Sequence, residues 1–548
     1  KGIQVVESAT LGSFDLTATS FLDIAANKTI NGPITLNNNA DLQISGSGEY
    51  LGNMELAGGK FSATDNQTLS GTLSITANSE LAVLENYTLV LNQSGGLPLG
   101  ANTLTLSGGG TLQSSGLELD DTNSKLKLSS IIVSNVITSA DSLGLEIDDN
   151  STITSLSVSN LTPVSITDGK SLSGGITVNT GGTVQLVDNG TLASNISMKG
   201  GTLDADKSLT ISGTVTSAGD FSIDVNSGIT LTFGAGEIKT ESFQLTLEGA
   251  GTVAFPANAS GIVLNHADGL LKLNGTGTVQ AARVIAASNT GKGVQVVKSS
   301  TISSLTVSAD TKLNIANGET LSGSTEVAAN KTLSLSGTGT FGSALNLEGT
   351  LEAGANLTVS GAISVADNAT VSIPDANTTL TYSGGNLTVG AYTFSIGGSG
   401  TFGNAADSPI VLAVEDSVLD LTGNGIISGP VRLEGCTLKA SGSPTISGVL
   451  TQSDNATIEV ATGQTLTYSG ASLNLGANKL TVTGGGTFNN SNALVLNNAD
   501  SLLALEGIVT IGGVKATVNA TSGKGIQVVE SATLGSFDLT ATSFLDIA

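Results

Sequence analysis

Hydrophobic and polar residues alternate along this chain in short runs. In Leu104–Leu106 and again in 480–482, aliphatic residues occupy every second position and a threonine stands between them. This period of two predicts β-strands of about three to five residues, since successive side chains of a strand point to opposite faces. Gly, Asn and Asp separate the runs and favour turns. We find no stretch of ten residues with helical periodicity, so the chain is expected to be all-β.

The runs recur at a nearly even spacing. The phrase Asn-x-Thr-Leu begins at Asn66 and again at Asn86, 20 residues later, and elsewhere the interval drifts between roughly 18 and 25 residues. Such strands fit either sandwiches of hairpins or a solenoid of stacked coils. Hairpins would use repeated two-residue turns such as Asn189-Gly190, and the phrase does not recur in that form. We therefore predict a right-handed parallel β-helix of about 20 residues per coil, continuous through the chain.

A much longer repeat overlies this spacing. Residues 1–25 return without change as 524–548, so that one period spans 523 residues. A diverged copy begins at Lys292 and matches 12 of the 25 positions. We predict a long solenoid sub-repeat at 1–291, a shorter one at 292–523, and the start of the next period at 524–548.

The charge and the aromatic content of the chain restrict the classes of function that it can have. The net charge is −25, from 20 Lys and Arg against 45 Asp and Glu. The chain therefore lacks the cations that nucleic acid or an anionic membrane surface requires, and no apolar run is long enough to insert into a membrane. Aromatic residues make up only 3% of the chain, whereas Gly contributes 71 residues. This composition suits many thin coils with small residues at the corners and aliphatic residues inside.

Two glycine-rich segments carry a family resemblance. GANTLTLSGGGTL at Gly100–Leu112 and GANKLTVTGGGTF at Gly476–Phe488 resemble the strand repeats of bacterial autotransporter passengers and filamentous-haemagglutinin-like surface proteins. The resemblance implies a right-handed parallel β-solenoid that lies outside the cell or on its surface. It also implies a role in adhesion or surface structure.

Few residues could carry catalysis. His266 is the single histidine, and the matching blocks of the chain have Asp121, Val414 and Asn498 in its place. No Ser-His-Asp or Cys-His system can be assembled around so variable a position. We expect a surface or corner residue there and predict that the chain is not an enzyme.

Neighbouring carboxylates and the one cysteine also have simple structural explanations. Asp120-Asp121 and Asp148-Asp149 are adjacent in sequence, and adjacent strand residues point to opposite faces. Cys436 stands where a related block has a glycine, which predicts a small-residue corner, with a cross-link between fibres as the alternative. We predict no cofactor, and Ca²⁺ is kept as an alternative because the chain is acidic.

Asn-x-Ser/Thr sequons are frequent, and several belong to the Asn-x-Thr-Leu phrase. They are candidate N-glycosylation sites wherever the asparagine is not used inside a stacked ladder. The candidates are Asn27, Asn66, Asn86, Asn150, Asn330, Asn356 and Asn455.

Taken together, these patterns predict a structural protein rather than an enzyme. Each coil would stack on the one before it, and the partner would be the chain itself, end to end, with lateral bundling as a further option. The alternatives are the stalk of an adhesin whose binding tip lies outside this segment, and a polysaccharide-active enzyme on the same fold. The first would show an aromatic or charged insertion, and the second a groove with clustered carboxylates.

Overall fold

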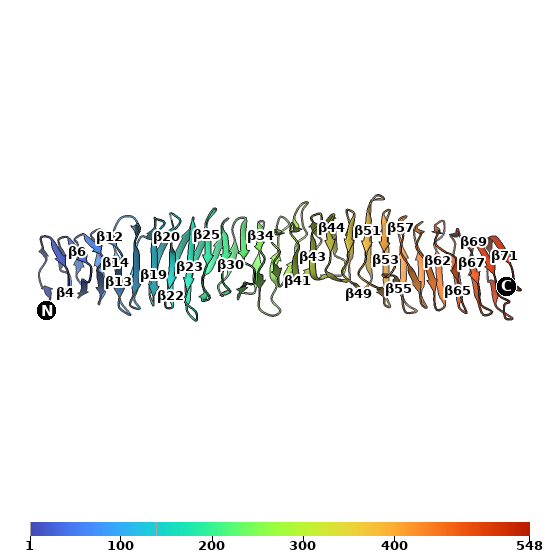
Figure 1. Cartoon of the computed structure of the whole chain (residues 1–548), viewed down its shortest axis with the longest axis horizontal. Coiled ribbons are helices and arrows are strands. Elements are labelled where there is room, and N and C mark those ends of the chain that lie inside the picture. Colours follow the sequence, from blue (N-terminus) through green and yellow to red (C-terminus); the bar gives the residue numbers. More distant parts are fainter. Residues whose placement is uncertain (1, 139, 548) are drawn as a thin grey trace. The chain divides into compact units, whose positions relative to one another are not determined.

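The computed structural model describes residues 2–138 and 140–547, and none of these residues is helical. Parallel strands stack as successive turns, about 26 of them with roughly 21 residues each, so the fold is a β-solenoid. Within each part of the chain, Figure 1 shows the strands side by side in sequence order. The all-β solenoid and its coil length are thus confirmed, while the right-handed sense of the coils stays a prediction.

The chain divides into two spatial units. The first contains Lys1–Val263 and Asn274–Ala281, and the second contains Leu264–Leu273 and Ala282–Ala548. The sub-repeat boundaries after residues 291 and 523 are a property of the sequence and stay predictions.

One face of the first unit is a ladder of strands, each paired in parallel with the next. Its strands are β1 (Ile3–Val5), β4 (Ser20–Ile24), β7 (Asp41–Ser45), β10 (Lys60–Ala63), β13 (Ser79–Val83), β16 (Thr103–Ser107), β19 (Lys125–Ser129), β21 (Gly144–Ile147), β23 (Leu161–Ile166), β25 (Thr183–Leu186), β28 (Thr202–Ala205), β31 (Phe221–Val225) and β34 (Gln244–Gly249).

The second unit has an equivalent ladder. Its strands are β37 (Leu270–Leu273), β40 (Gly293–Val296), β42 (Thr311–Ile315), β44 (Thr332–Gly337), β47 (Thr350–Ala353), β50 (Ala369–Ile373), β53 (Thr393–Gly398), β56 (Val418–Leu421), β59 (Thr437–Ala440), β62 (Ala456–Val460), β65 (Lys479–Gly484), β68 (Leu502–Glu506), β70 (Gly525–Val528) and β72 (Phe544–Ile547).

Shorter strands complete each turn on the remaining faces. Two four-stranded sheets lie one in each unit: β3 (Phe14–Leu16), β6 (Ile34–Asn37), β9 (Met54–Ala57) and β12 (Leu73–Ala77), and then β52 (Leu387–Val389), β55 (Ile410–Leu412), β58 (Val431–Leu433) and β61 (Leu450–Gln452). The other strands include β2 (Ala9–Thr10), β5 (Thr29–Asn31), β48 (Leu357–Val359), β51 (Thr379–Tyr382), β69 (Val509–Ala516) and β71 (Ala532–Leu539).

Register places like residues above one another inside the coil. In the first unit Leu203 pairs with Ile223, and Ile223 with Leu247. All three side chains are buried, and the polar residues between them face outward. Each fully buried aliphatic side chain contributes about 1.5–3 kcal/mol relative to exposure. The alternation of apolar and polar residues in the sequence therefore corresponds to the inner and outer faces of one wall of the coil.

Large side chains fill the interior at a few corners, where their polar atoms bond to the turn. Tyr50 is buried, and its hydroxyl donates to the Gly32 carbonyl oxygen at 2.5 Å. The Tyr468 hydroxyl accepts from the Leu450 amide at 3.2 Å and donates to the Ala471 carbonyl. Burial raises the pKa of Tyr468. These bonds allow a phenol to lie in an otherwise aliphatic core without an unpaired polar group.

The stacked core predicts a sharp contrast between two neighbours on β28. Leu203→Ala leaves a cavity between the coils above and below, and should cost about 2–5 kcal/mol. Thr202→Ala changes an outward-facing side chain of the same strand and should cost within about 0.5 kcal/mol. Urea unfolding followed by circular dichroism measures both. Equal effects of the two substitutions would contradict a core made of inward columns.

Candidate functional site

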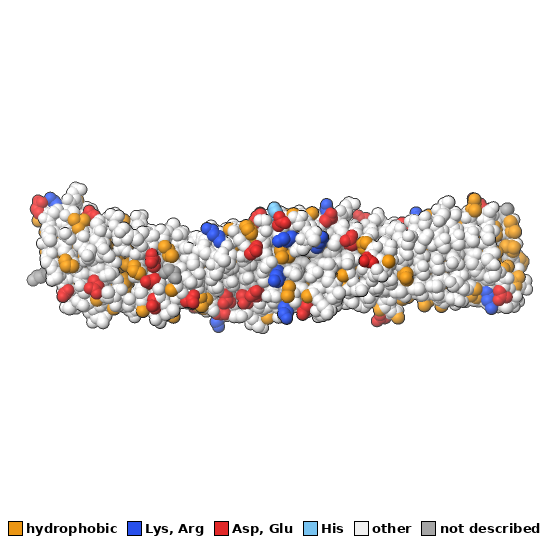
Figure 2. Space-filling model, turned by 90° about the horizontal axis from the view of Figure 1, so that it is seen from above, with side chains coloured by type: hydrophobic (Ala, Val, Ile, Leu, Met, Phe, Trp, Pro, Cys, Tyr) orange, Lys and Arg blue, Asp and Glu red, His pale blue; other side chains and the backbone are white. Residues whose placement is uncertain are grey.

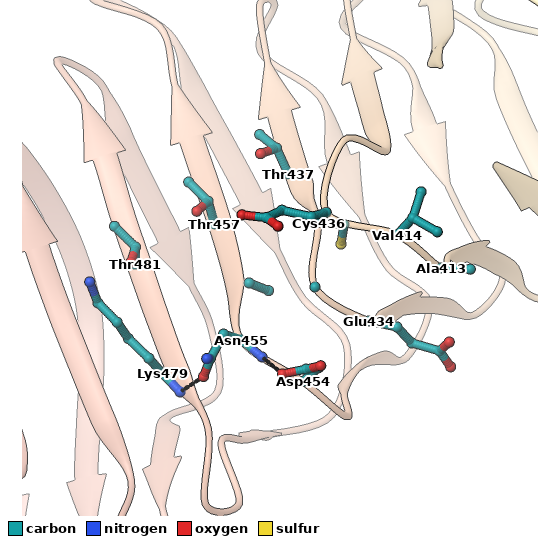
Figure 3. A pocket seen from close by; sticks show the side chains of 13 residues that line it. Ala413, Val414, Glu434, Cys436, Thr437, Asp454, Asn455, Thr457, Lys479 and Thr481 are labelled. Carbon is teal, nitrogen blue, oxygen red and sulfur yellow. Dashed lines mark hydrogen bonds between the residues drawn. The ribbon is translucent and has the colours of Figure 1, made fainter. Parts of the chain in front are cut away.

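A hollow on the surface of the second unit is lined by residues of four successive turns. It has a volume of about 660 Å³. Loop residues before β56, β59 and β62 form one side, and β59, β62 and β65 form the floor (Figure 3). The floor carries Thr437, Thr457 and Thr481, which occupy one outward column because their strands pair in register. We call this site the Cys436 hollow, after the cysteine in its wall.

Two of the charged side chains around the Cys436 hollow form ion pairs. The Glu434 carboxylate lies 2.5 Å from the Arg432 Nε atom, and the Lys479 ammonium lies 3.1 Å from the Glu506 carboxylate. The main-chain amide of Lys479 donates to the Asn455 side-chain oxygen at 2.7 Å, a contact drawn in Figure 3. The two contacts of Lys479 join successive turns, whereas the Arg432–Glu434 pair lies within one turn. A substrate would have to compete for each of these groups.

The Cys436 thiol lies in surroundings that disfavour its ionised form. The residue is 4% exposed, and burial raises the pKa of its thiol to about 11. A reactive cysteine needs a lowered pKa and solvent access. Cys436 directly precedes β59, as Gly201 precedes β28, so the predicted small-residue corner is what the structure contains. Its burial also argues against a cross-link between fibres.

His266 lies in the turn between two strands, with its side chain half exposed. Its Nδ1 atom is 3.7 Å from an oxygen of Asp268 and accepts the Asp268 main-chain amide at 3.1 Å. These are contacts within one turn. They give the imidazole a local structural role and bring no nucleophile to it.

The two carboxylate pairs serve separate structural contacts. Asp120 accepts the Gly100 amide at 2.8 Å, which joins two turns, whereas Asp121 accepts an amide within its own turn. Asp149 accepts a hydrogen bond from the Lys170 ammonium at 2.8 Å, and this bond, together with those from the Asn150 amide and the Ser130 hydroxyl, lowers the pKa of Asp149 to about 2. Members of a pair therefore do not converge on a common point, as acid and base catalysis on one substrate would require.

All seven sequon asparagines are exposed. Three of them occupy corners in the left-handed region, with φ of 61° at Asn27, 70° at Asn86 and 60° at Asn330. Asparagine tolerates this conformation better than most residues. The recurring Asn of the sequence phrase is thus explained in part by turn geometry, and glycosylation at these positions stays a prediction.

The other four sequon asparagines join one turn to the next. In each, the side-chain oxygen accepts a main-chain amide from the following turn. The bonds are Asn66 to Thr88 at 2.9 Å, Asn150 to Ser171 at 2.9 Å, Asn356 to Thr379 at 2.7 Å and Asn455 to Lys479 at 2.7 Å. These bonds satisfy amides at the beginning of strands, where the ladder alone leaves them without an acceptor.

An acidic column in the first unit was not anticipated from the sequence. Asp204 on β28 pairs with Asp224 on β31, which pairs with Glu248 on β34. Burial, with the charges of Asp206 and Asp224, raises the pKa of Asp204 to about 6. Burial and the charge of Glu248 also raise the pKa of Asp224. Counting acidic residues at one coil interval in aligned strands would have found this column.

The arrangement of the described residues bears on metal binding and on membrane insertion. Among residues 2–138 and 140–547, no group of three or more His, Cys, Asp or Glu side chains is placed to hold a metal ion. Calcium binding stays a prediction. In the same part of the chain, no helix has the length and apolar character needed to cross a bilayer.

Comparisons with protein-family models, curated proteins and solved structures found no match to this chain. The fold itself defines a parallel β-solenoid repeat protein. The resemblance to bacterial surface fibres is therefore confirmed at the level of that fold, and the family and its extracellular location stay predictions.

The asparagine contacts between turns can be tested at Asn356. Asn356→Ala removes the acceptor for the Thr379 amide and should lower the free energy of unfolding by about 1 kcal/mol. Asn356→Asp keeps an oxygen acceptor and should recover most of that loss. Thermal unfolding of both variants distinguishes the two effects. Equal destabilisation by Ala and Asp would show that the hydrogen bond is not the cause.

The acidic column predicts an unusual pH dependence. Because the folded chain holds the Asp204 proton more tightly than the unfolded chain, stability should fall as pH rises from about 4 to 6 and then level off. Asp204→Asn should flatten this fall and raise stability at pH 7 by about 1 kcal/mol, after allowance for solvent screening. The exposed Asp407 provides a matched control, Asp407→Asn. Thermal melts between pH 4 and 8 measure the stability of both variants. The same pH dependence in Asp204→Asn and Asp407→Asn would contradict this interpretation.

Proposed function

We propose that this chain is a non-catalytic structural segment of an extracellular filament or surface fibre. The observation that carries the proposal is the unchanged return of residues 1–25 as 524–548, in a chain whose other repeats have drifted. Tandem expansion lengthens a solenoid without requiring a new binding site. In a filament, each added repeat directly increases the length of the assembly.

The packing within each unit supports a mechanical role. Every turn is joined to its neighbours by parallel backbone ladders and by inward aliphatic columns. On the face shown in Figure 2, uncharged atoms predominate and the charged side chains are scattered. A net charge of −25 provides repulsion between neighbouring fibres and favours solubility. The partner in this proposal is the chain itself, joined period to period.

The Cys436 hollow is one location at which the enzyme alternative can be weighed. Its lining includes the carboxylates of Glu415, Glu434 and Asp454 and the ammonium of Lys479. Glu434 and Lys479 form ion pairs, and no aromatic side chain lines the hollow. Sugar-binding clefts rely on aromatic faces to bind a glycan, so the composition of the hollow supports a non-catalytic role.

Electron microscopy of native material tests the filament directly. We expect unbranched filaments with an axial repeat of roughly 120 Å, which is the rise of about 25 coils, one 523-residue period, at about 4.8 Å each. Separate particles without an axial repeat would contradict the proposal. A globular tip on each filament would instead favour the adhesin stalk.

A polysaccharide panel tests the absence of catalysis. We expect no new reducing ends and no unsaturated products from neutral or acidic glycans incubated with the full chain. Activity that disappears in Glu434→Gln and persists in the control Glu237→Gln would overturn the non-catalytic assignment.

A further inference from the structure

One stretch of the chain departs from its acidic character. Residues 264–331 contain six Lys or Arg residues and four Asp or Glu residues, whereas the whole chain contains 20 and 45. Four of these lysines recur once per turn along the ladder of the second unit. Lys272 lies on β37, Lys292 directly precedes β40, Lys312 lies on β42 and Lys331 directly precedes β44, and these strands pair in that order. We call these four residues the lysine band.

The lysine band lacks counter-charges. Among the described residues, no carboxylate oxygen lies within 4.0 Å of a side-chain nitrogen of the band. The carboxylates next to the band in sequence have other contacts, since Asp268 accepts a side-chain amide at 2.8 Å and Asp310 accepts the Thr332 main-chain amide at 2.9 Å. On the ladder of the first unit, by contrast, Lys60 is paired with Glu80 of the next turn at 2.7 Å. The band therefore presents four neighbouring positive charges to solvent.

The acidic column of the first unit has the opposite charge and the same spacing. Asp204, Asp224 and Glu248 provide one carboxylate in each of three successive turns. In the part of the chain that the structure describes, no Lys, Arg or His nitrogen lies within 4.0 Å of these carboxylates. The outward residues beside the column, Thr202 and Ser222, are small. A long side chain from another molecule can therefore reach the carboxylates.

We propose that two copies of the chain pair side by side, with the lysine band of one copy on the acidic column of the other. The pairing goes beyond the proposed filament and does not require it. Both rows place one charge in each turn, and turns lie about 4.8 Å apart, so that several ion pairs form in one register. A second copy is favoured as the partner because every copy carries both rows.

The remaining surface charge makes this contact selective. With a net charge of −25, most other lateral contacts bring acidic surfaces together and are opposed by repulsion. Exposed ion pairs are individually weak, so isolated chains should associate weakly and in a salt-dependent manner. Chains joined in a filament would repeat the contact once per period, and this multivalency would strengthen a lateral bundle.

Cross-linking between isotopically distinct full-length chains tests the pairing. Chains with natural and with heavy nitrogen are mixed at low salt and treated with a carbodiimide, which joins a lysine to a carboxylate in contact with it. We expect mass spectrometry to find hybrid peptides that join Lys292 or Lys312 of one isotope to the acidic column of the other. Raising the ionic strength from about 0.01 M to about 1 M shortens the screening length from about 30 Å to about 3 Å, and should reduce these hybrid peptides by about tenfold or more.

Two paired variants test each row separately. Lys292→Gln with Lys312→Gln weakens the band, and Asp204→Asn with Asp224→Asn weakens the column. Each variant alone should lose most hybrid peptides. A mixture of the two should regain them, because one chain keeps its column and the other keeps its band. The regained peptides should join lysines of the second variant to carboxylates of the first, and never the reverse.

Lysines outside the band supply the controls. Lys524 precedes β70 as Lys292 precedes β40, and its hybrid peptides should be rarer by about tenfold because no lysine band surrounds it. Lys28→Gln with Lys524→Gln changes the net charge as much as the band variant does and should leave the hybrid peptides at the level of the unaltered chain. Circular dichroism melts confirm that every variant is folded.

The outcomes separate the pairing from the filament. Filaments on microscopy grids without hybrid peptides between band and column would overturn the pairing and leave the filament intact. Hybrid peptides between single chains that form no filament would support the pairing and overturn the filament alone. Hybrid peptides that persist in the column variant would overturn the pairing. Binding of the acidic glycan polygalacturonate through the band, without hybrid peptides, would also overturn it and assign the band to a glycan.

Discussion

Each strand of this protein depends on the turns beside it for its ladder of backbone hydrogen bonds, and the bonds of an inner strand are shared between the turn before it and the turn after it. A parallel strand cannot pair with its immediate neighbour in sequence through a tight turn, so the chain must complete a full coil before its amides find acceptors. One coil is therefore the smallest structural unit of the fold, and a single coil is not stable without its neighbours. The aliphatic columns and corner contacts are consequences of that stacking, since register fixes which residues meet.

Stacking restricts the residue types at inward and corner positions far more than it restricts those at outward positions. Inward positions accept aliphatic residues such as Leu203, and corners accept Gly or an asparagine that bonds to the next turn, as Asn356 does. Outward positions are so loosely constrained that Asp204 and Asp224 lie in one column in spite of their mutual repulsion. A repeat can therefore drift on its surface and keep its fold.

The fold was predictable because its main signal is local and repeated. Alternation in runs such as Leu104–Leu106 identified strands, and the even spacing identified coils. The small-residue corner predicted at Cys436 is also present, and the structure adds that the thiol is buried. The acidic column and the Cys436 hollow were not predicted, because they depend on which turns align, and coil length varies from turn to turn. The pairing of Glu434 with Arg432 likewise requires the structure.

A stacked coil also limits what kind of function the chain can perform. Outward side chains of neighbouring turns lie about 4.8 Å apart in a flat array. Such an array favours ladders of like residues and does not readily form a closed cavity. In this chain some polar members of that array are paired with each other, as Lys479 is with Glu506. Backbone groups are satisfied by each added coil, because every new coil pairs with the one before it. The architecture is therefore extended by adding coils without any change to its outward side chains, which is the property on which the proposed fibre relies.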